Sequence, residues 1–141
     1  MIVVDASVAA KWLLPEAGEQ EAQALLDGEE RLAAPETIRI EVAGAVIKRY
    51  RTGTMDETDA RSRCEFWQSL IDNRLHLLPV EGLFDKAMGL AFQLKHGLPD
   101  CLYLAAAGNI GAGLITADRT LFERGKAVHD RIQLLAGIDP H

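Results

Sequence analysis

The stretch Ile2-Val3-Val4-Asp5-Ala6-Ser7-Val8 indicates how the rest of the chain folds. Its first three residues are apolar, with no polar alternation, which is typical of a strand buried on both faces in a parallel sheet. Residues 8–14 then favour a helix. A turn from such a strand into a helix lies at the carboxyl edge of the sheet, where open α/β folds bind ligands. Asp5 and Ser7 are therefore candidate site residues, and the alternative is that they only cap the helix.

The size and composition of the chain predict one folded domain. A length of 141 residues is enough for one core and short for two domains. Hydrophobic residues make up 48% and charged residues 26%, which excludes a disordered chain. No apolar run approaches the roughly 20 residues of a membrane helix, and no signal-peptide pattern is present, so we expect a cytoplasmic protein. Cys64 and Cys101 are expected to be free, buried thiols.

The formal net charge of −6 disfavours an obligate nucleic-acid binder without sequence preference, because such proteins are usually basic. It does not exclude a nuclease. A group of metal-binding carboxylates adds negative charge that a bound cation offsets locally.

Strand and helix patterns alternate along the chain, which predicts a single α/β domain over residues 1–141 with a mostly parallel five-stranded sheet flanked by helices. The expected strands are 2–4, 31–34, 75–80, 113–116 and 132–135, and the expected helices are 8–14, 19–26, 37–50, about 55–71, 83–94, 101–107 and 118 to about 124.

Glu41 lies on the apolar side of the expected helix 37–50. It follows Ile38 by three residues and precedes Ala45 by four, so it points inward with the apolar stripe. An inward carboxylate is costly unless it is hydrogen-bonded, paired or bound to a cation. The alternative to a site residue is a salt bridge with a basic residue elsewhere in the chain.

Two further acids precede helices. Asp100 comes before an apolar and therefore buried helix, and Asp118 follows the apolar run Leu114-Ile115-Thr116-Ala117, which repeats the arrangement around Asp5. Each could be an N-cap. Taken together, Asp5, Asp118 and Asp100 would share one edge of the sheet, with Glu41 directed toward it.

A group of four carboxylates is stable only with protonation or bound cations, because like charges repel. Oxygen ligands without His or Cys select a hard ion such as Mg²⁺ or Mn²⁺. Such an ion can activate a water molecule against a phosphodiester.

The four segments that contain these acids resemble those of the PIN-domain ribonucleases, specifically the VapC-type toxins of type II toxin–antitoxin pairs. They occur in the family's order across nearly the whole chain: residues 2–8, 40–42, 100–105 and 116–119. The resemblance implies a parallel five-stranded sheet, Mg²⁺- or Mn²⁺-dependent endoribonuclease activity, a homodimer and inhibition by a small VapB-type antitoxin.

The resemblance also implies roles for individual residues. Asp5, Glu41, Asp100 and Asp118 would be the acidic metal-site residues, with Ser7 and Thr116 as hydrogen-bonding supports. Water would attack in line and leave a 5′-phosphate and a 3′-hydroxyl. Lys11 and Arg119 adjoin the expected site and are candidates for contacts to RNA phosphates. One departure is Pro99, which stands where an aromatic residue frequently precedes the third acid.

Two other classes are compatible with acids at strand ends. A phosphoacceptor signalling domain would need an acidic pair after the first strand and a Lys after the last, whereas Asp5 has Val4 and Ala6 as neighbours and the last strand is followed by Ala136-Gly137. A catalytically weak PIN-like module that binds RNA or protein remains the closer alternative. The presence of all four acids disfavours it.

Overall fold

The computed structural model describes residues 1–140 and contains one five-stranded sheet in which every strand pairs in parallel. The strand order is β3-β2-β1-β4-β5. Val4 lies opposite Ile115, which sets the ends of β1 and β4 side by side. The parallel sheet predicted from the sequence is confirmed. The strands are β1 (Ile2–Val4), β2 (Leu32–Pro35), β3 (Leu75–Leu78), β4 (Gly113–Thr116) and β5 (Ile132–Leu134).

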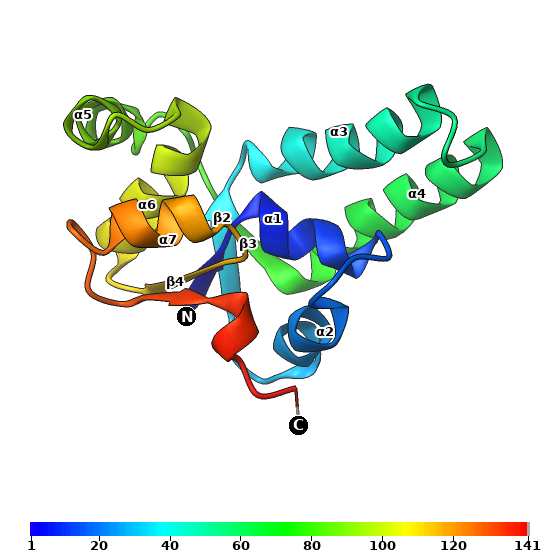
Figure 1. Ribbon diagram of the computed structural model, residues 1–141, viewed down its shortest axis with the longest axis horizontal. Coiled ribbons are helices and arrows are strands. Elements are labelled where there is room, and N and C mark those ends of the chain that lie inside the picture. The colour runs from blue at the N-terminus through cyan, green and yellow to red at the C-terminus, as the bar shows by residue number, and fades with distance from the viewer. Residues whose placement is uncertain (141) are drawn as a thin grey trace.

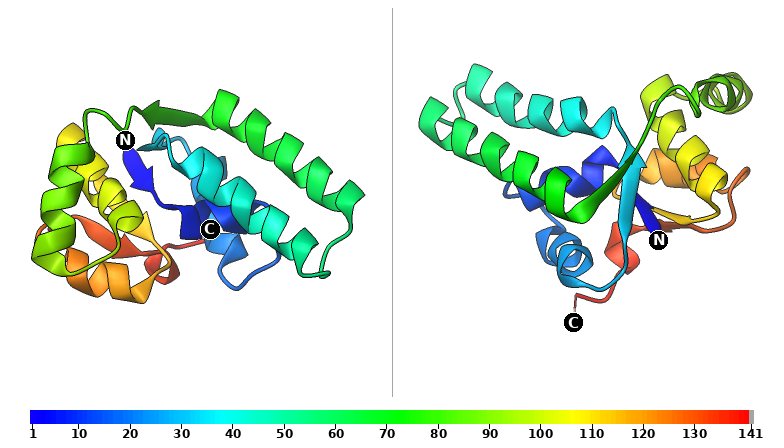
Figure 2. Two further views of the ribbon diagram at one scale, coloured as in Figure 1. Left: turned by 90° about the horizontal axis from the view of Figure 1, so that it is seen from above. Right: turned by 180° about the vertical axis from the view of Figure 1, so that it is seen from behind.

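Helices cover both faces of the sheet. Helices α1 to α4 lie on one side and α5 to α7 on the other (Figure 2). Helices α3 and α4 form a hairpin that projects from the body of the molecule (Figure 1). The helices are α1 (Ala6–Ala9), the 3₁₀ helix η1 (Ala10–Trp12), α2 (Glu19–Asp27), α3 (Ile38–Arg51), α4 (Glu57–Arg74), α5 (Phe84–Leu94), α6 (Leu98–Ile110), α7 (Arg119–Gly125) and the 3₁₀ helix η2 (Leu135–Gly137).

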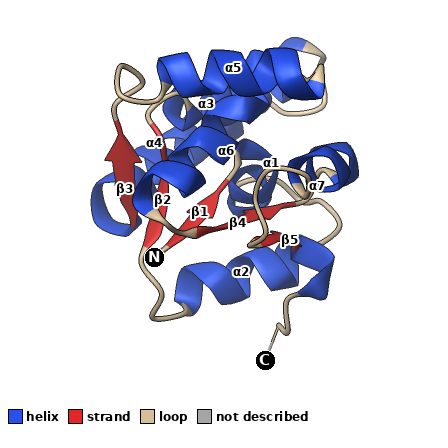
Figure 3. Ribbon diagram, turned by 90° about the vertical axis from the view of Figure 1, so that its left-hand side faces the viewer, coloured by secondary structure: helices blue, strands red, loops and turns tan. Residues whose placement is uncertain are grey.

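Helix α6 is the central helix of the core. It packs over β1, β2 and β4 (Figure 3), and residues 101–107 are all buried, as its apolar composition predicted. On the opposite side of the sheet, the buried Trp12 and Trp67 rings lie 6.4 Å apart. The Trp12 indole N–H also donates to the Ala22 carbonyl at 2.8 Å. These contacts join η1, α4 and α2 on this side of the sheet.

Some boundaries differ from those expected. The helix expected over residues 8–14 begins at Ala6 and becomes 3₁₀ from Ala10; Pro15 disfavours helical backbone at the residue before it. The helix expected to begin at Cys101 begins at Leu98, because Pro99 occupies its first turn, where a missing N–H costs nothing. Cys101 is buried and Cys64 is only half-buried, since Cys64 faces a groove between α3 and α4 that Ile47 and Tyr50 also line.

No helix within residues 1–140 combines the length and apolar character needed to cross a membrane.

Candidate metal site at the carboxyl ends of β1 and β4

The order in which the chain adds strands to the sheet reverses between β1 and β4. From β1 the chain builds outward through β2 and β3, and it then returns to build β4 and β5 on the other side of β1. Ligands of open α/β sheets bind in the crevice outside the carboxyl ends of the strands at such a switch point. Asp5 directly follows β1, and Thr116 is the last residue of β4.

Asp5 is the most buried of the four candidate acids, with 3% of its surface exposed. Its Oδ1 accepts hydrogen bonds from the Ser7 hydroxyl at 2.6 Å and from the Val8 backbone N–H at 3.1 Å. Its Oδ2 accepts a hydrogen bond from the Thr116 hydroxyl. Asp5 therefore caps α1 and also connects to β4, so the two alternative interpretations from the sequence are compatible.

Burial raises the pKa of Asp5 to about 6, because the charged carboxylate loses hydration. The hydrogen bonds from Ser7, Thr116 and Val8 act in the opposite direction, and the negative charge of Asp100 raises the pKa further. The Asp5 carboxylate is therefore held in place while its charge is disfavoured, which is a condition that a nearby cation would relieve.

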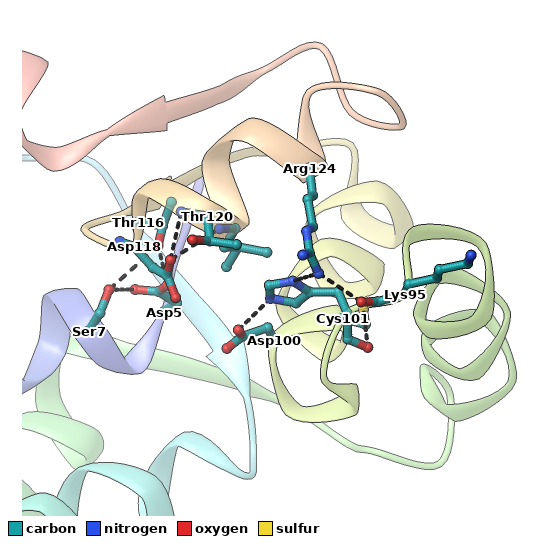
Figure 4. Close-up of polar contacts among 11 residues, drawn as sticks. Asp5, Ser7, Lys95, Asp100, Cys101, Thr116, Asp118, Thr120 and Arg124 are labelled. Atoms are coloured by element: carbon teal, nitrogen blue, oxygen red, sulfur yellow. Dashed lines mark hydrogen bonds and ion pairs between the residues drawn. The ribbon is translucent and has the colours of Figure 1, made fainter.

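Ser7 and Thr116 connect the two loops at this edge (Figure 4). The Ser7 hydroxyl accepts from the Ala117 backbone N–H at 3.0 Å, and the Thr116 hydroxyl accepts from the Asp118 backbone N–H at 3.0 Å. Each hydroxyl also donates to Asp5. The loop after β4 is thus fixed to the loop after β1 through the Asp5 carboxylate.

Glu41 lies in the first turn of α3 and is half-buried. Its Oε1 accepts a 2.9 Å hydrogen bond from the hydroxyl of Tyr103, which is fully buried in α6. Burial raises the pKa of Glu41, the Tyr103 hydrogen bond lowers it, and the charge of Asp100 raises it again. None of the ion pairs among the described residues involves Glu41, so the alternative of a salt bridge is not what the structure contains.

Asp100 lies in the first turn of α6 and is not the N-cap, which is Gly97. Its Oδ2 lies 2.7 Å from Nε2 of His96. Its charge raises the pKa of Asp5 and of Glu41, so these three carboxylates, from three separate elements, share one electrostatic environment. Burial raises the pKa of Tyr103 far above its usual range, and the charge of Glu41 adds to that effect, so the Tyr103 phenol stays a donor.

Asp118 is placed at the same edge of the sheet, but its carboxylate caps α7. Its Oδ1 accepts from the backbone N–H groups of Thr120 at 2.8 Å and Leu121 at 3.1 Å. Its connection to Asp5 runs through Thr116 and involves the Asp118 backbone. The structure thus brings Asp118 next to Asp5 along the sheet edge without a direct contact between the two carboxylates.

The donor set fits a hard divalent cation in its chemistry, because it consists of carboxylate oxygens, and the charge of Asp100 raises the pKa of both Asp5 and Glu41. The arrangement is not a preformed cage. Within residues 1–140, no three His, Cys, Asp or Glu side chains lie close enough together to hold one ion.

The two candidate phosphate-binding residues differ in their surroundings. The Lys11 ammonium lies 3.4 Å from Oε1 of Glu16, and its side chain is mostly buried. Arg119, directly after Asp118, is exposed. Of the two, Arg119 is the more accessible to a ligand at this edge.

Sequence reasoning missed three residues that contact the candidate acids or their partners: Tyr103, His96 and Arg124. For two of them a signal was present. Tyr103 follows Asp100 by three residues on the same helix, a spacing that brings side chains to one side of it, and His96 lies only four residues before Asp100, in the turn that leads into that helix. Nothing in the sequence near Arg124 connects it to Asp100.

A family model described as "PIN domain" matches residues 2–127. The chain therefore belongs to the PIN-domain family. Within it, the chain groups with the VapC proteins: it is 32% identical over 130 residues to "Ribonuclease VapC3" of Pyrobaculum aerophilum, with 90% of this chain and 96% of that protein covered. It is also 32% identical over 127 residues to "Ribonuclease VapC9" of Mycobacterium tuberculosis, with 90% and 93% covered.

Solved structures share the fold. The crystal structure of PAE2754 from Pyrobaculum aerophilum aligns with a TM-score of 0.72 at 22% identity, over 96% of this chain and 83% of that one. The structure of FitAcB from Neisseria gonorrhoeae aligns with a TM-score of 0.55 at 16% identity, over 99% and 98% of the two chains.

Proposed function

We propose that this protein is a divalent-metal-dependent endoribonuclease that acts as the toxin of a VapBC-type toxin–antitoxin pair. The observation that carries the proposal is the buried Asp5 carboxylate at the switch point of the sheet, which Ser7 and Thr116 hold between the ends of β1 and β4. The charge of Asp100 raises the pKa of Asp5 and of Glu41, which supports a shared site for these acids. The names of the VapC relatives, which are called ribonucleases, support the reaction class.

Asp5, Glu41, Asp100 and Asp118 would hold Mg²⁺ or Mn²⁺. When bound, such an ion supplies positive charge that offsets the charge developing on the phosphate oxygens and makes a water molecule more acidic. To bind one ion, these carboxylates would have to turn toward it. Repulsion among these acids favours that change, because the cation relieves it.

The remaining residues of the site orient the acids and the substrate. Ser7 and Thr116 fix the Asp5 carboxylate with hydrogen bonds to both of its oxygens, and Tyr103 holds one oxygen of Glu41. Arg119, which is exposed beside Asp118, would contact an RNA phosphate, and Lys11 would do so if the phosphate displaces Glu16. No side chain of the protein needs to act as the nucleophile, because water is the attacking group.

The proposed partners follow from the same classification. A VapC-type toxin is expected to form a homodimer and to be inhibited by a VapB-type antitoxin. Because the proposed substrate is cellular RNA, the proposed place of action is the cytoplasm.

Cleavage of labelled RNA by the purified protein tests the proposal, with Mg²⁺, Mn²⁺ or EDTA present. We expect cleavage with either metal and none with EDTA. The charge-removing variants Asp5→Asn, Glu41→Gln, Asp100→Asn and Asp118→Asn should abolish it while the fold is retained. Glu81→Gln, an exposed acid after β3, is the matched control and should cleave normally. Cleavage that persists in EDTA or in the Asp5 variant would reject the proposal, and RNA binding without cleavage would favour the binding module.

A further inference from the structure

We propose that His96 and Arg124 form a positioning pair that fixes the carboxylate of Asp100, an inference that rests on the proposed metal site. The His96 imidazole lies between the two other groups. Its Nε2 is 2.7 Å from Oδ2 of Asp100, and its Nδ1 is 3.3 Å from Nη1 of Arg124. Only 8% of the His96 side chain is exposed, so the ring has a defined place in the structure.

The contact with Arg124 determines which ring nitrogen carries the proton. A guanidinium group has only hydrogen-bond donors, so Nδ1 of His96, which faces it, must be the acceptor. In the neutral ring the proton is then on Nε2, which donates to Asp100. Arg124 thus fixes the tautomer that allows His96 to hold the carboxylate.

Arg124 is itself anchored. The same Nη1 donates a 2.7 Å hydrogen bond to the backbone carbonyl of Lys95 (Figure 4). Lys95 ends α5 with a φ of 53°, the only positive φ of a residue other than glycine within residues 1–140. This left-handed turn leads directly into His96, so the end of α5 presents both the carbonyl and the imidazole to Arg124.

The pair also connects the elements that carry two of the proposed metal-site acids. Arg124 belongs to α7, which Asp118 caps, and Asp100 lies in the first turn of α6. A hydrogen bond that holds one oxygen of a ligating carboxylate restricts its rotation and preserves its charge, and loss of such a partner typically weakens metal binding about 10- to 100-fold. His96 is therefore a positioning residue, since it acts on a bound ion only through Asp100.

The tautomer is tested first, without metal. We would record ¹⁵N imidazole spectra of the full-length protein in EDTA and assign His96 from its absence in His96→Leu. The expected state is protonation at Nε2, with a mixture of both tautomers in Arg124→Met. Lys126→Met, an exposed change on the same stretch of chain, should leave the His96 signals unchanged. Protonation of His96 at Nδ1 would overturn the proposal.

Metal affinity is tested second, by calorimetric titration with Mn²⁺. Gln places an amide N–H near the position of Nε2, so His96→Gln should bind within about threefold of wild type, while His96→Leu should bind at least about tenfold more weakly. His76→Leu, at an exposed position of β3, is the control and should match wild type. Thermal melts of all variants exclude unfolding as the cause.

The outcomes separate this inference from the proposed function. Equal Mn²⁺ affinity of wild type and His96→Leu, or equal weakening in the Gln and Leu variants, would overturn the positioning role while leaving the ribonuclease proposal intact. A wild-type protein that binds no Mn²⁺ and cleaves no RNA would overturn both.

Discussion

The Tyr103 hydroxyl donates a 2.9 Å hydrogen bond to Oε1 of Glu41 and so joins α6 to α3 across 62 positions of sequence. Asp100 lies three residues before Tyr103 on the same helix. Helix α6 therefore supplies one candidate metal ligand and the support of another. Any shift of α6 against the sheet would move Asp100 and the anchor of Glu41 together.

Tyr103→Phe should destabilise the protein by about 1–2 kcal/mol, because it removes a hydrogen bond to a half-buried carboxylate and changes little else. Glu41→Gln should be milder, since the amide oxygen can still accept from the phenol. Urea unfolding of the two variants and wild type measures the difference. Equal stability of wild type and Tyr103→Phe would show that the bond contributes nothing to the fold.

Thr116→Val should cost about 2–3 kcal/mol, because the buried hydroxyl both donates to Asp5 and accepts from the Asp118 backbone N–H. Valine has nearly the same shape as threonine but can neither donate nor accept a side-chain hydrogen bond. Thr116→Ser keeps the hydroxyl and is the matched control, with a smaller loss expected. The Thr116 bond also lowers the pKa of Asp5, so that pKa should rise in the Val variant, as carboxyl NMR titration would report.

Asp5 should make the metal-free protein less stable as the pH rises. Its pKa is about 6 in the folded protein and 3.8 in its ordinary state, so the folded chain binds the proton more tightly. The stabilisation of the folded state by protonated Asp5 is fully present below about pH 4 and is lost as the pH rises through about 6. The shift corresponds to about 3 kcal/mol.

The measurement is urea unfolding in EDTA between pH 4 and 7.5, compared for wild type and Asp5→Asn. The stability of wild type relative to the variant should fall across this range, and Mg²⁺ should restore part of the loss above pH 6. Parallel curves for the two proteins would contradict the assignment of the raised pKa to Asp5.

Two helical glycines should respond to alanine with opposite signs. A Cβ on Gly125 in α7 would lie 2.8 Å from Ile132 Cδ1 and 3.1 Å from Leu104 Cδ2, so Gly125→Ala should destabilise the protein by about 1 kcal/mol after the gain in helix propensity. Gly89 in α5 has nothing within 4 Å of its Cβ position. Gly89→Ala should therefore stabilise the protein by about 1 kcal/mol, and thermal unfolding would report both changes.

Most of the fold could be predicted from the sequence, because apolar strands and amphipathic helices alternate with clear breaks. All five strands are found close to the expected positions, and the parallel sheet follows from them. The ends of helices were harder to predict where a residue such as proline can either end a helix or stand in its first turn. The sequence predicts a helix that begins at Cys101, whereas α6 begins at Leu98 because Pro99 is compatible with the first turn of a helix.

The candidate site could be predicted only in part. The inward position of Glu41 follows from helical spacing, and the places of Asp5 and Asp118 follow from strand ends, because both are set by local geometry. The partners of these acids depend on tertiary contacts between distant segments. Arg124 reaches His96 only because α7 packs beside the end of α5, and no local pattern encodes that approach.

Strands β1 and β4 meet at Asp5 and Thr116, which are 111 positions apart in the chain. During translation, β1 leaves the ribosome well before the residues of β4 are synthesised. An unfinished nascent chain therefore lacks both Thr116 and Asp118 and cannot assemble the proposed centre. For a protein proposed to cleave RNA, this order of synthesis would keep cellular RNA safe from each copy until the end of its fourth strand has been made.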